Sequence, residues 1–314
     1  APQAAASGFN PADFYAGPMD QLQVDPATGQ KADGFIWGVP RDVSTFALYL
    51  NLDLIDEAGA EDPRELAANG EWTWDKFAEV SQQIADNVPG SKGFGAGGWW
   101  ANWGYFVNSA GGSFYNEDRT ACALDSDASI AGLTFYQDLY ASGSGVPFGE
   151  DAEPPFKAGT LGMFINGRWA TPGAREITSF NWDVAPLPTG AAPGKDWLFW
   201  GAYVVNANTA NPDAAWKLVE ALTSTEVQDK VASLGANIPS RTSQEAIDAF
   251  LTYTPPANNQ AFVDGIQNDP VAEGPLWTGS WPAFDKASGD EVTALMTGKI
   301  TIDEFQKTIC KAAA

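Results

Sequence analysis

The chain has 314 residues, of which 44% are hydrophobic and 18% are charged, and this composition is typical of a folded globular protein. With 40 acidic and 17 basic residues its formal net charge is −23, which excludes binding to nucleic acid or to anionic lipid through a basic surface. Histidine is absent, so the commonest general base and metal ligand are missing, and we expect neither a cofactor nor a metal.

In chain order the predicted elements alternate between strands and helices, which favours an α/β fold. Residues 1–15 lack the basic and apolar regions of a targeting signal, and no apolar run reaches the length of a membrane span. Periodicity predicts strands at 35–39 and 45–50, helices at 72–88 and 126–143, strands at 160–165, 182–187 and 198–205, and helices at 211–222, 223–235 and 301–313.

Capping signals mark the starts of several predicted helices. Thr73 is placed to cap the helix at 72–88. The pairs Thr223/Glu226 and Thr301/Glu304 have the spacing of a capping box, in which each side chain bonds the other residue's backbone N–H. We therefore predict helix starts at these positions.

The only two cysteines, Cys122 and Cys310, are too far apart in the sequence to form a local metal site. Two alternatives remain from the residues alone, a long-range disulfide or two inert thiols. We favour the disulfide, which implies an oxidising compartment outside the cytoplasm.

The stretch GGWWANWGYF (97–106) places Trp99, Trp100 and Trp103 directly after glycines. Indoles in such a place either fill a core or form a flat surface on which a ligand stacks. In a helix, Trp99 and Trp103 would share one side and Trp100 would face elsewhere. We expect the three rings to divide between a binding site and the core.

Five blocks follow one another along most of the chain. They are WGVPRDVSTFALYLNLDLIDEAG (37–59), WTWDKF (72–77), FKAGTLGMFINGRWA (156–170), NWDVAPLPTG (181–190), and GAYVVNANTANPDAAWKLVEALTSTEVQ (201–228) with ANIPSR (236–241). In this order they resemble the extracellular solute-binding proteins of ABC sugar importers, the class that includes maltose-binding protein. Gly162 departs from the third block, where the family usually has alanine.

The resemblance implies a two-lobe α/β fold of the type II periplasmic-binding-protein kind. It assigns residues 1–41 and 203–253 to the N-terminal lobe, and residues 42–202 and 254–314 to the C-terminal lobe. Family members begin with a longer lobe segment than the roughly 35 residues found here, so we expect one lobe to be incomplete, by on the order of a hundred residues. A second chain is one way to supply the missing part.

The resemblance also implies a function, partners and a location. The protein would close two lobes on a neutral sugar or oligosaccharide and deliver it to an ABC permease in the membrane. Its location would be extracytoplasmic, in the periplasm, attached to the cell surface as a lipoprotein or secreted. Both cysteines fall in the C-terminal lobe, which supports a disulfide between Cys122 and Cys310.

Site residues follow from the same blocks, because sugars are held by aromatic faces and by fans of polar side chains. Each candidate also has a structural interpretation: the indoles as core residues, and Arg41 as part of a solvated salt bridge. The predicted ligand-binding residues are Trp169, Trp99, Trp103, Asn102, Asp42, Ser44, Trp200, Trp277 and Trp281.

Two other classes of function remain possible from the sequence. A glycoside hydrolase also combines tryptophans with acids, and it needs two carboxylates flanking the scissile bond. A carbohydrate-binding or structural module without a transport role would suit a family member that lacks its first segment. We expect a binding protein and no enzymatic activity, because no local motif supports hydrolysis.

Overall fold

The chain was analysed as a computed structural model, which describes residues 2–25, 27–28, 30–193, 195–235, 237–272 and 280–312. The strands form two sheets of four, with orders β7-β1-β6-β8 and β3-β4-β2-β5. Their bounds are β1 Val39–Ser44, β2 Phe46–Asn51, β3 Lys92–Gly95, β4 Leu161–Gly167, β5 Trp182–Ala185, β6 Trp197–Tyr203, β7 Ile238–Pro239 and β8 Val271–Ala272.

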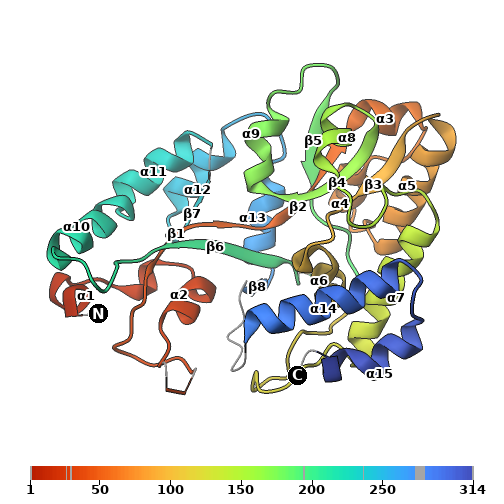
Figure 1. The fold of residues 1–314 in the computed structure, drawn as a ribbon. Coiled ribbons are helices and arrows are strands. Elements are labelled where there is room, and N and C mark those ends of the chain that lie inside the picture. Colours follow the sequence, from red (N-terminus) through yellow and green to blue (C-terminus); the bar gives the residue numbers. More distant parts are fainter. Residues whose placement is uncertain are drawn as a thin grey trace.

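Helices surround both sheets (Figure 1). The α-helices are α1 Pro2–Ser7, α2 Ala16–Leu22, α3 Leu52–Glu57, α4 Pro63–Ala68, α5 Trp74–Asn87, α6 Trp100–Ser109, α7 Asp127–Ala141, α8 Glu153–Lys157, α9 Thr171–Ala174, α10 Pro212–Leu222, α11 Thr225–Ser233, α12 Gln244–Leu251, α13 Gln260–Gln267, α14 Trp281–Met296 and α15 Ile302–Ala312. Two 3-10 turns, η1 Pro11–Asp13 and η2 Arg168–Ala170, complete the list.

The two sheets are joined by short connections between strands. β1 runs into β2 through the single residue Thr45, and β5 leads back to β6, which pairs antiparallel with β1. Figure 1 shows α10, α11 and α12 beside the first sheet, and α3, α5 and α7 around the second. The predicted lobe boundaries at 41/42 and 202/203 fall inside β1 and β6, so these strands form the junction between the two halves.

The apolar core is unevenly divided. The largest cluster packs the second sheet against α5, α6, α7, α14 and α15, and a second cluster spans the junction. A third, around α2 and α10, has four fully buried members among the described residues: Phe14, Met19, Val39 and Val219. The N-terminal half therefore has less core to hold it together.

Most predicted elements are confirmed, and two differ for local reasons. The strand predicted at 35–39 is wrong: the strand begins at Val39, and Trp37 before it bonds through both of its N–H groups to Leu22 and Val24 carbonyls. The Thr223/Glu226 box is also wrong. Thr223 closes α10 by donating its hydroxyl to the Val219 carbonyl, and Ser224 caps α11 instead. The Thr301/Glu304 box is confirmed by reciprocal bonds.

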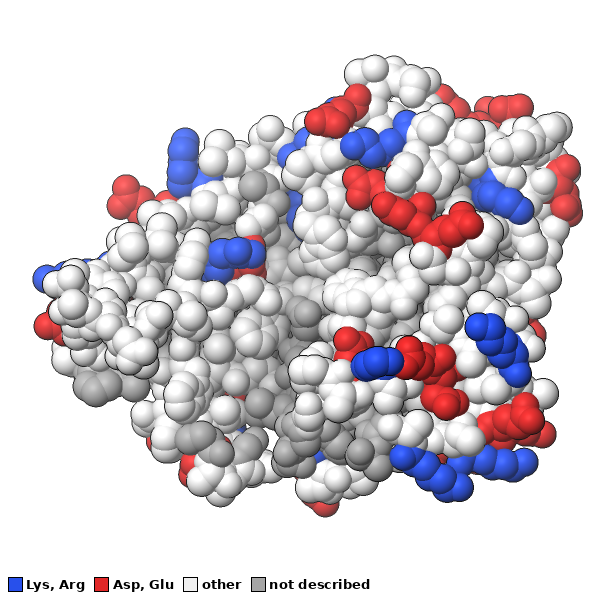
Figure 2. Space-filling view, viewed as in Figure 1, with Lys and Arg blue, Asp and Glu red and all other residues white. Residues whose placement is uncertain are grey.

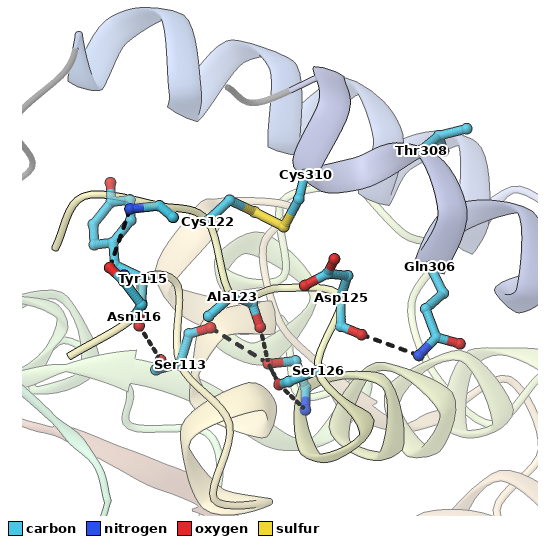
Figure 3. The surroundings of a disulfide bond; sticks show 12 residues. Ser113, Tyr115, Asn116, Cys122, Ala123, Asp125, Ser126, Gln306, Thr308 and Cys310 are labelled. Carbon is cyan, nitrogen blue, oxygen red and sulfur yellow. Dashed lines mark hydrogen bonds between the residues drawn. A yellow bond between two sulfur atoms is a disulfide. The ribbon is translucent and has the colours of Figure 1, made fainter. Parts of the chain in front are cut away.

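Cys122 and Cys310 form a disulfide that fastens α15 to the segment before α7 (Figure 3). Nearby, Gln306 of α15 donates to the Asp125 carbonyl at 3.0 Å. The bond closes a loop with a sequence separation of 188. It fixes the C-terminal helix to the larger half of the molecule.

The surface carries both signs of charge. Figure 2 shows Lys and Arg side chains scattered among Asp and Glu side chains over one face. No helix within the described residues is long and apolar enough to cross a membrane.

Candidate functional site

A cavity of about 340 Å³ lies at the junction of the two sheets. Its floor and sides come from β1 and β6, from Trp99 at the N-cap of α6, and from the η2 turn that follows β4. The described lining residues are Arg41, Asp42, Val43, Ser44, Trp99, Arg168, Trp169, Phe199, Trp200, Gly201 and Asn237. Residues far apart in the sequence thus meet here because β1 and β6 cross between the sheets.

One wall of the cavity is aromatic. Trp99 and Trp169 are 40% and 47% exposed, which is unusual for side chains of this size. Phe199 supports both: its ring is stacked with Trp99 at 5.5 Å and meets the Trp169 ring edge-on at 5.1 Å. The buried Phe46 ring lies 4.7 Å behind Phe199. The indoles are therefore held in place while part of their surface faces the cavity.

The opposite wall is polar. Arg41 and Asp42 form an ion pair at 3.0 Å, and the Asn237 side-chain amide donates to the same Asp42 oxygen. The register of β1 shifts between Pro40 and Asp42, a bulge that redirects these side chains. A Cβ on Gly201 of β6 would come 2.9 Å from the Arg41 guanidinium. Glycine therefore leaves the space that the ion pair occupies.

Ser44 and Arg168 connect the two walls. The Ser44 hydroxyl accepts the backbone N–H of Arg168 at 3.0 Å and donates to the Thr45 carbonyl. The Arg168 side chain is buried, and burial lowers the pKa of its guanidinium to about 10. The turn that carries Trp169 is thus tied directly to the end of β1.

Five of the predicted ligand-binding residues line the cavity together. They are Trp99, Trp169 and Trp200 among the aromatic residues, and Asp42 and Ser44 among the polar ones. Arg41, which also has the structural interpretation of a salt bridge, both forms that salt bridge and lines the cavity.

Asn102 and Trp103 lie elsewhere, in contrast to the prediction. Trp103 is 1% exposed and stacks on Phe114 at 4.7 Å, and Asn102 is also buried. The reason is the start of α6: Trp99 is its N-cap, and every residue from 100 to 109 is buried. Trp99 and Trp103 therefore do not share a side, and the helix has no face open to the cavity.

The two tryptophans near α14 contribute no described wall. Trp281 is partly buried, with its ring 5.3 Å from Trp100 and 5.9 Å from Phe284, and it does not line the cavity. Trp277 lies outside the described residues.

Phe199, Gly201 and Asn237 are lining residues that the sequence interpretation missed. Phe199 lies in an apolar strand run, where nothing separates a cavity residue from a core residue. Asn237 lies in ANIPSR, a block of the resemblance, and that position was the available signal.

The sequence profile described as "Bacterial extracellular solute-binding protein" matches residues 3–229, which is more than half of the chain. A maltooligosaccharide ABC transporter solute-binding lipoprotein of Streptococcus pneumoniae is 26% identical over 242 residues, covering 70% of this chain and 54% of that protein. A maltotriose-binding protein of Pyrococcus abyssi is 26% identical over 251 residues, covering 77% and 48%.

The chain spans only part of these relatives. A Brucella abortus protein, named only as a candidate binding protein, is 23% identical over 288 residues, covering 85% of this chain and 64% of its own length. The curated relatives therefore contain substantially more polypeptide than the 314 residues.

Solved structures share the fold. The substrate-binding protein Lmo0181 of Listeria monocytogenes, in complex with cycloalternan, superposes with a TM-score of 0.82 at 20% identity, covering 99% of this chain and 81% of that one. The GacH receptor of Streptomyces glaucescens, solved without ligand and with acarbose, gives 0.76 at 21% identity, covering 99% and 79%. The two-sheet α/β architecture is that of type II periplasmic binding proteins.

Proposed function

The chain belongs to the bacterial extracellular solute-binding proteins, and from this premise we propose that it binds a neutral sugar or oligosaccharide in the cavity between its sheets and delivers it to an ABC importer. The observation that carries the proposal is the pair of walls: two part-exposed indoles, fixed by Phe199, stand across from the Arg41–Asp42–Asn237 cluster.

The two walls match the two faces of a pyranose ring. The axial C–H groups form an apolar face that packs on an indole, and the hydroxyls radiate in the ring plane toward donors and acceptors. Asp42 can accept hydrogen bonds from adjacent hydroxyls, while Arg41 and Asn237 can donate to their oxygens. The single ion pair balances its own charge, and together with the net charge of −23 this favours a neutral ligand.

Hydrolysis is the weaker candidate. A glycosidase needs two carboxyl groups on either side of the scissile bond. Among the described residues that line the cavity, Asp42 is the only acid, and it is held by Arg41 and Asn237. The lining therefore suits recognition of a sugar better than its cleavage.

Ligand capture would involve two lobes that move about the junction. We assign residues 1–41 and 203–253 to one lobe and residues 42–202 and 254–314 to the other, with β1 and β6 as the strands that cross. Closure would bring the polar wall, which belongs mainly to β1 and the segment before β7, toward the Trp99 and Trp169 rings.

The N-terminal lobe also presents an uncovered apolar surface. Trp37 is 52% exposed and Val204 is 67% exposed, and a pocket of about 340 Å³ beside them includes Tyr203 and Trp216. We propose that polypeptide outside these 314 residues, on the same chain or on a second one, covers this surface and completes the lobe. The intact mass and subunit composition of the protein purified from its own cells test this; a lone 33.3 kDa chain would contradict it.

The same assignment places the protein outside the cytoplasm. The Cys122–Cys310 disulfide suits an oxidising compartment, the periplasm or the cell surface. The Streptococcus pneumoniae relative is named a lipoprotein, and attachment through a lipid is one way for this chain to remain near a permease.

A panel of neutral oligosaccharides tests the function. Tryptophan fluorescence and the melting temperature should change with at least one sugar, because the cavity carries exposed indoles and a ligand stabilises the folded state. Chromatography of the same mixtures should show no cleavage products. Products would overturn the binding function in favour of hydrolysis, and no response to any sugar would favour a module without a transport role.

A further inference from the structure

The side chain of Arg168 lies in the junction between the two halves of the molecule. Its guanidinium lies over the Phe250 ring at 4.7 Å and the Phe262 ring at 5.4 Å. One of its terminal nitrogens donates to the Thr171 hydroxyl at 3.0 Å. The other crosses to the Gly235 carbonyl at 2.8 Å, beyond the end of α11.

A second arginine binds the same carbonyl. Arg175, just after α9, donates to the Gly235 oxygen at 3.1 Å and to the Pro255 carbonyl at 2.7 Å. Its guanidinium lies 4.1 Å from the centre of the Tyr253 ring. A carbonyl oxygen has two lone pairs, so it can accept both bonds at once. Two cations from one half therefore hold a single backbone oxygen of the other.

The two arginines have no carboxylate partner within the part of the chain that the structure describes. A buried cation is costly unless hydrogen bonds and ring faces replace its water. For Arg168 these partners come from both halves at once, and its Nε lacks a partner. A rotation of one half that withdraws the Gly235 carbonyl would leave the guanidinium less well solvated, so the contact favours the present arrangement.

The residues that make this contact are sequence neighbours of both cavity walls. Arg168 immediately precedes Trp169 of the aromatic wall. Gly235 lies two positions before Asn237, which binds Asp42 in the polar wall. The distance between Arg168 and Gly235 thus limits how far the two walls can separate.

We propose that Arg168 and Arg175 form an interlobe clasp on the Gly235 carbonyl, and that this clasp positions the Trp169 wall against the Asp42–Asn237 wall for ligand binding. The proposal rests on the proposed function of the cavity. Arg175 acts without touching the ligand, because it is absent from the cavity lining. Both are positioning residues, and their loss would populate more open arrangements with weaker binding.

Arg175→Gln is the test variant, because it removes one half of the clasp outside the cavity. Both native cysteines are in the disulfide, so spin labels on Leu218→Cys of α10 and Asp86→Cys of α5 report the separation of the halves. Without ligand, pulsed electron resonance should show a longer and broader distance distribution in Arg175→Gln than in the parent.

The same proteins, without labels, are titrated with maltotriose as the probe. We expect affinity to fall about tenfold in Arg175→Gln, within the range typical of coupling between sites. Arg175→Lys, which keeps a charged donor, should recover part of the loss. Lys157→Gln on α8 is the matched control, since it removes a cation paired with surface acids, and it should change neither readout.

The outcomes separate the clasp from the function. A parent-like distance distribution and affinity in folded Arg175→Gln, with only a lower melting temperature, would show that the arginine is merely structural and would overturn the proposal. If the parent does not bind maltotriose but the distances still lengthen in Arg175→Gln, the clasp stands and the assignment of this sugar fails.

Discussion

The indole of Trp169 meets that of Trp99 nearly edge to face, with ring centroids 6.2 Å apart and planes at 69°. One residue lies on the turn after β4 and the other caps α6, yet both rest on Phe199 of β6. Neither ring depends on the other's element for its position, since the strand that crosses between the sheets supports both. The aromatic wall is therefore set up at the junction itself.

Trp169→Ala should abolish sugar binding while leaving most of the stability intact, because nearly half of the side chain is exposed and little core is lost. Titration calorimetry and thermal melting measure the two effects. Trp103→Ala is the matched variant: its ring is buried, so it should lower the free energy of unfolding by about 3–5 kcal/mol. A large stability loss in Trp169→Ala with binding retained would make that indole structural.

Asp42→Asn should weaken sugar binding by about tenfold or more, because a hydrogen bond to a charged acceptor is worth about 1.5–3 kcal/mol. The substitution also removes the partner of Arg41, so the polar wall loses its ion pair as well as an acceptor. Calorimetric titration with the best sugar of the panel measures the change. Asp86→Asn, an exposed acid on α5, serves as the control and should bind like the parent.

Burial raises the pKa of the Asp196 carboxyl well above its usual range, although backbone N–H groups of Trp197 and Phe46 partly oppose the shift. The folded state therefore holds this proton more tightly than the unfolded state. Below the ordinary value of 3.8 both states are protonated, and as the pH rises from there through the raised pKa the folded protein loses stability.

Asp196→Asn removes this pH dependence. The stability of the variant relative to the parent should thus increase between pH 3.5 and pH 7, and one pKa unit corresponds to about 1.4 kcal/mol. Urea unfolding followed by circular dichroism at both pH values measures it. An equal difference at the two values would contradict the expectation.

Removal of the disulfide by Cys122→Ser with Cys310→Ser should destabilise the larger half by about 3–5 kcal/mol, because a long closed loop restricts the unfolded chain. Thermal unfolding with and without reductant measures the effect, and reductant should not change the double variant. Thiol titration of the denatured, unreduced parent should find no free thiol. Two free thiols would show that the bond is absent from the protein.

The sequence predicts much of the fold because its strongest signals are local. The run at 45–50 is apolar throughout and becomes a buried strand, and Thr301 with Glu304 forms the expected box. The strand at 35–39 fails because strand pairing depends on β6 and β7, which are far away in the chain. Thr223 fails because its hydroxyl has a competing acceptor in the helix before it.

The cavity was less predictable than the fold. Trp99 and Trp169 were reached through the family resemblance, whereas Trp103 was misplaced because a one-residue choice of helix start decides which side of α6 a ring occupies. Phe199 and Asn237 have ordinary sequence surroundings. Their role depends on three segments meeting at the junction, which no local pattern encodes.

The disulfide between Cys122 and Cys310 also governs how the molecule responds to mechanical force. When the oxidised chain is pulled by its two ends, tension passes across the sulfur bridge and bypasses the polypeptide between the cysteines. The 188 positions in that loop, roughly 60 nm of contour at about 3.4 Å per residue, become extensible only after reduction. Under load, the larger half, with its buried indoles, is thereby shielded, and the N-terminal segments extend first.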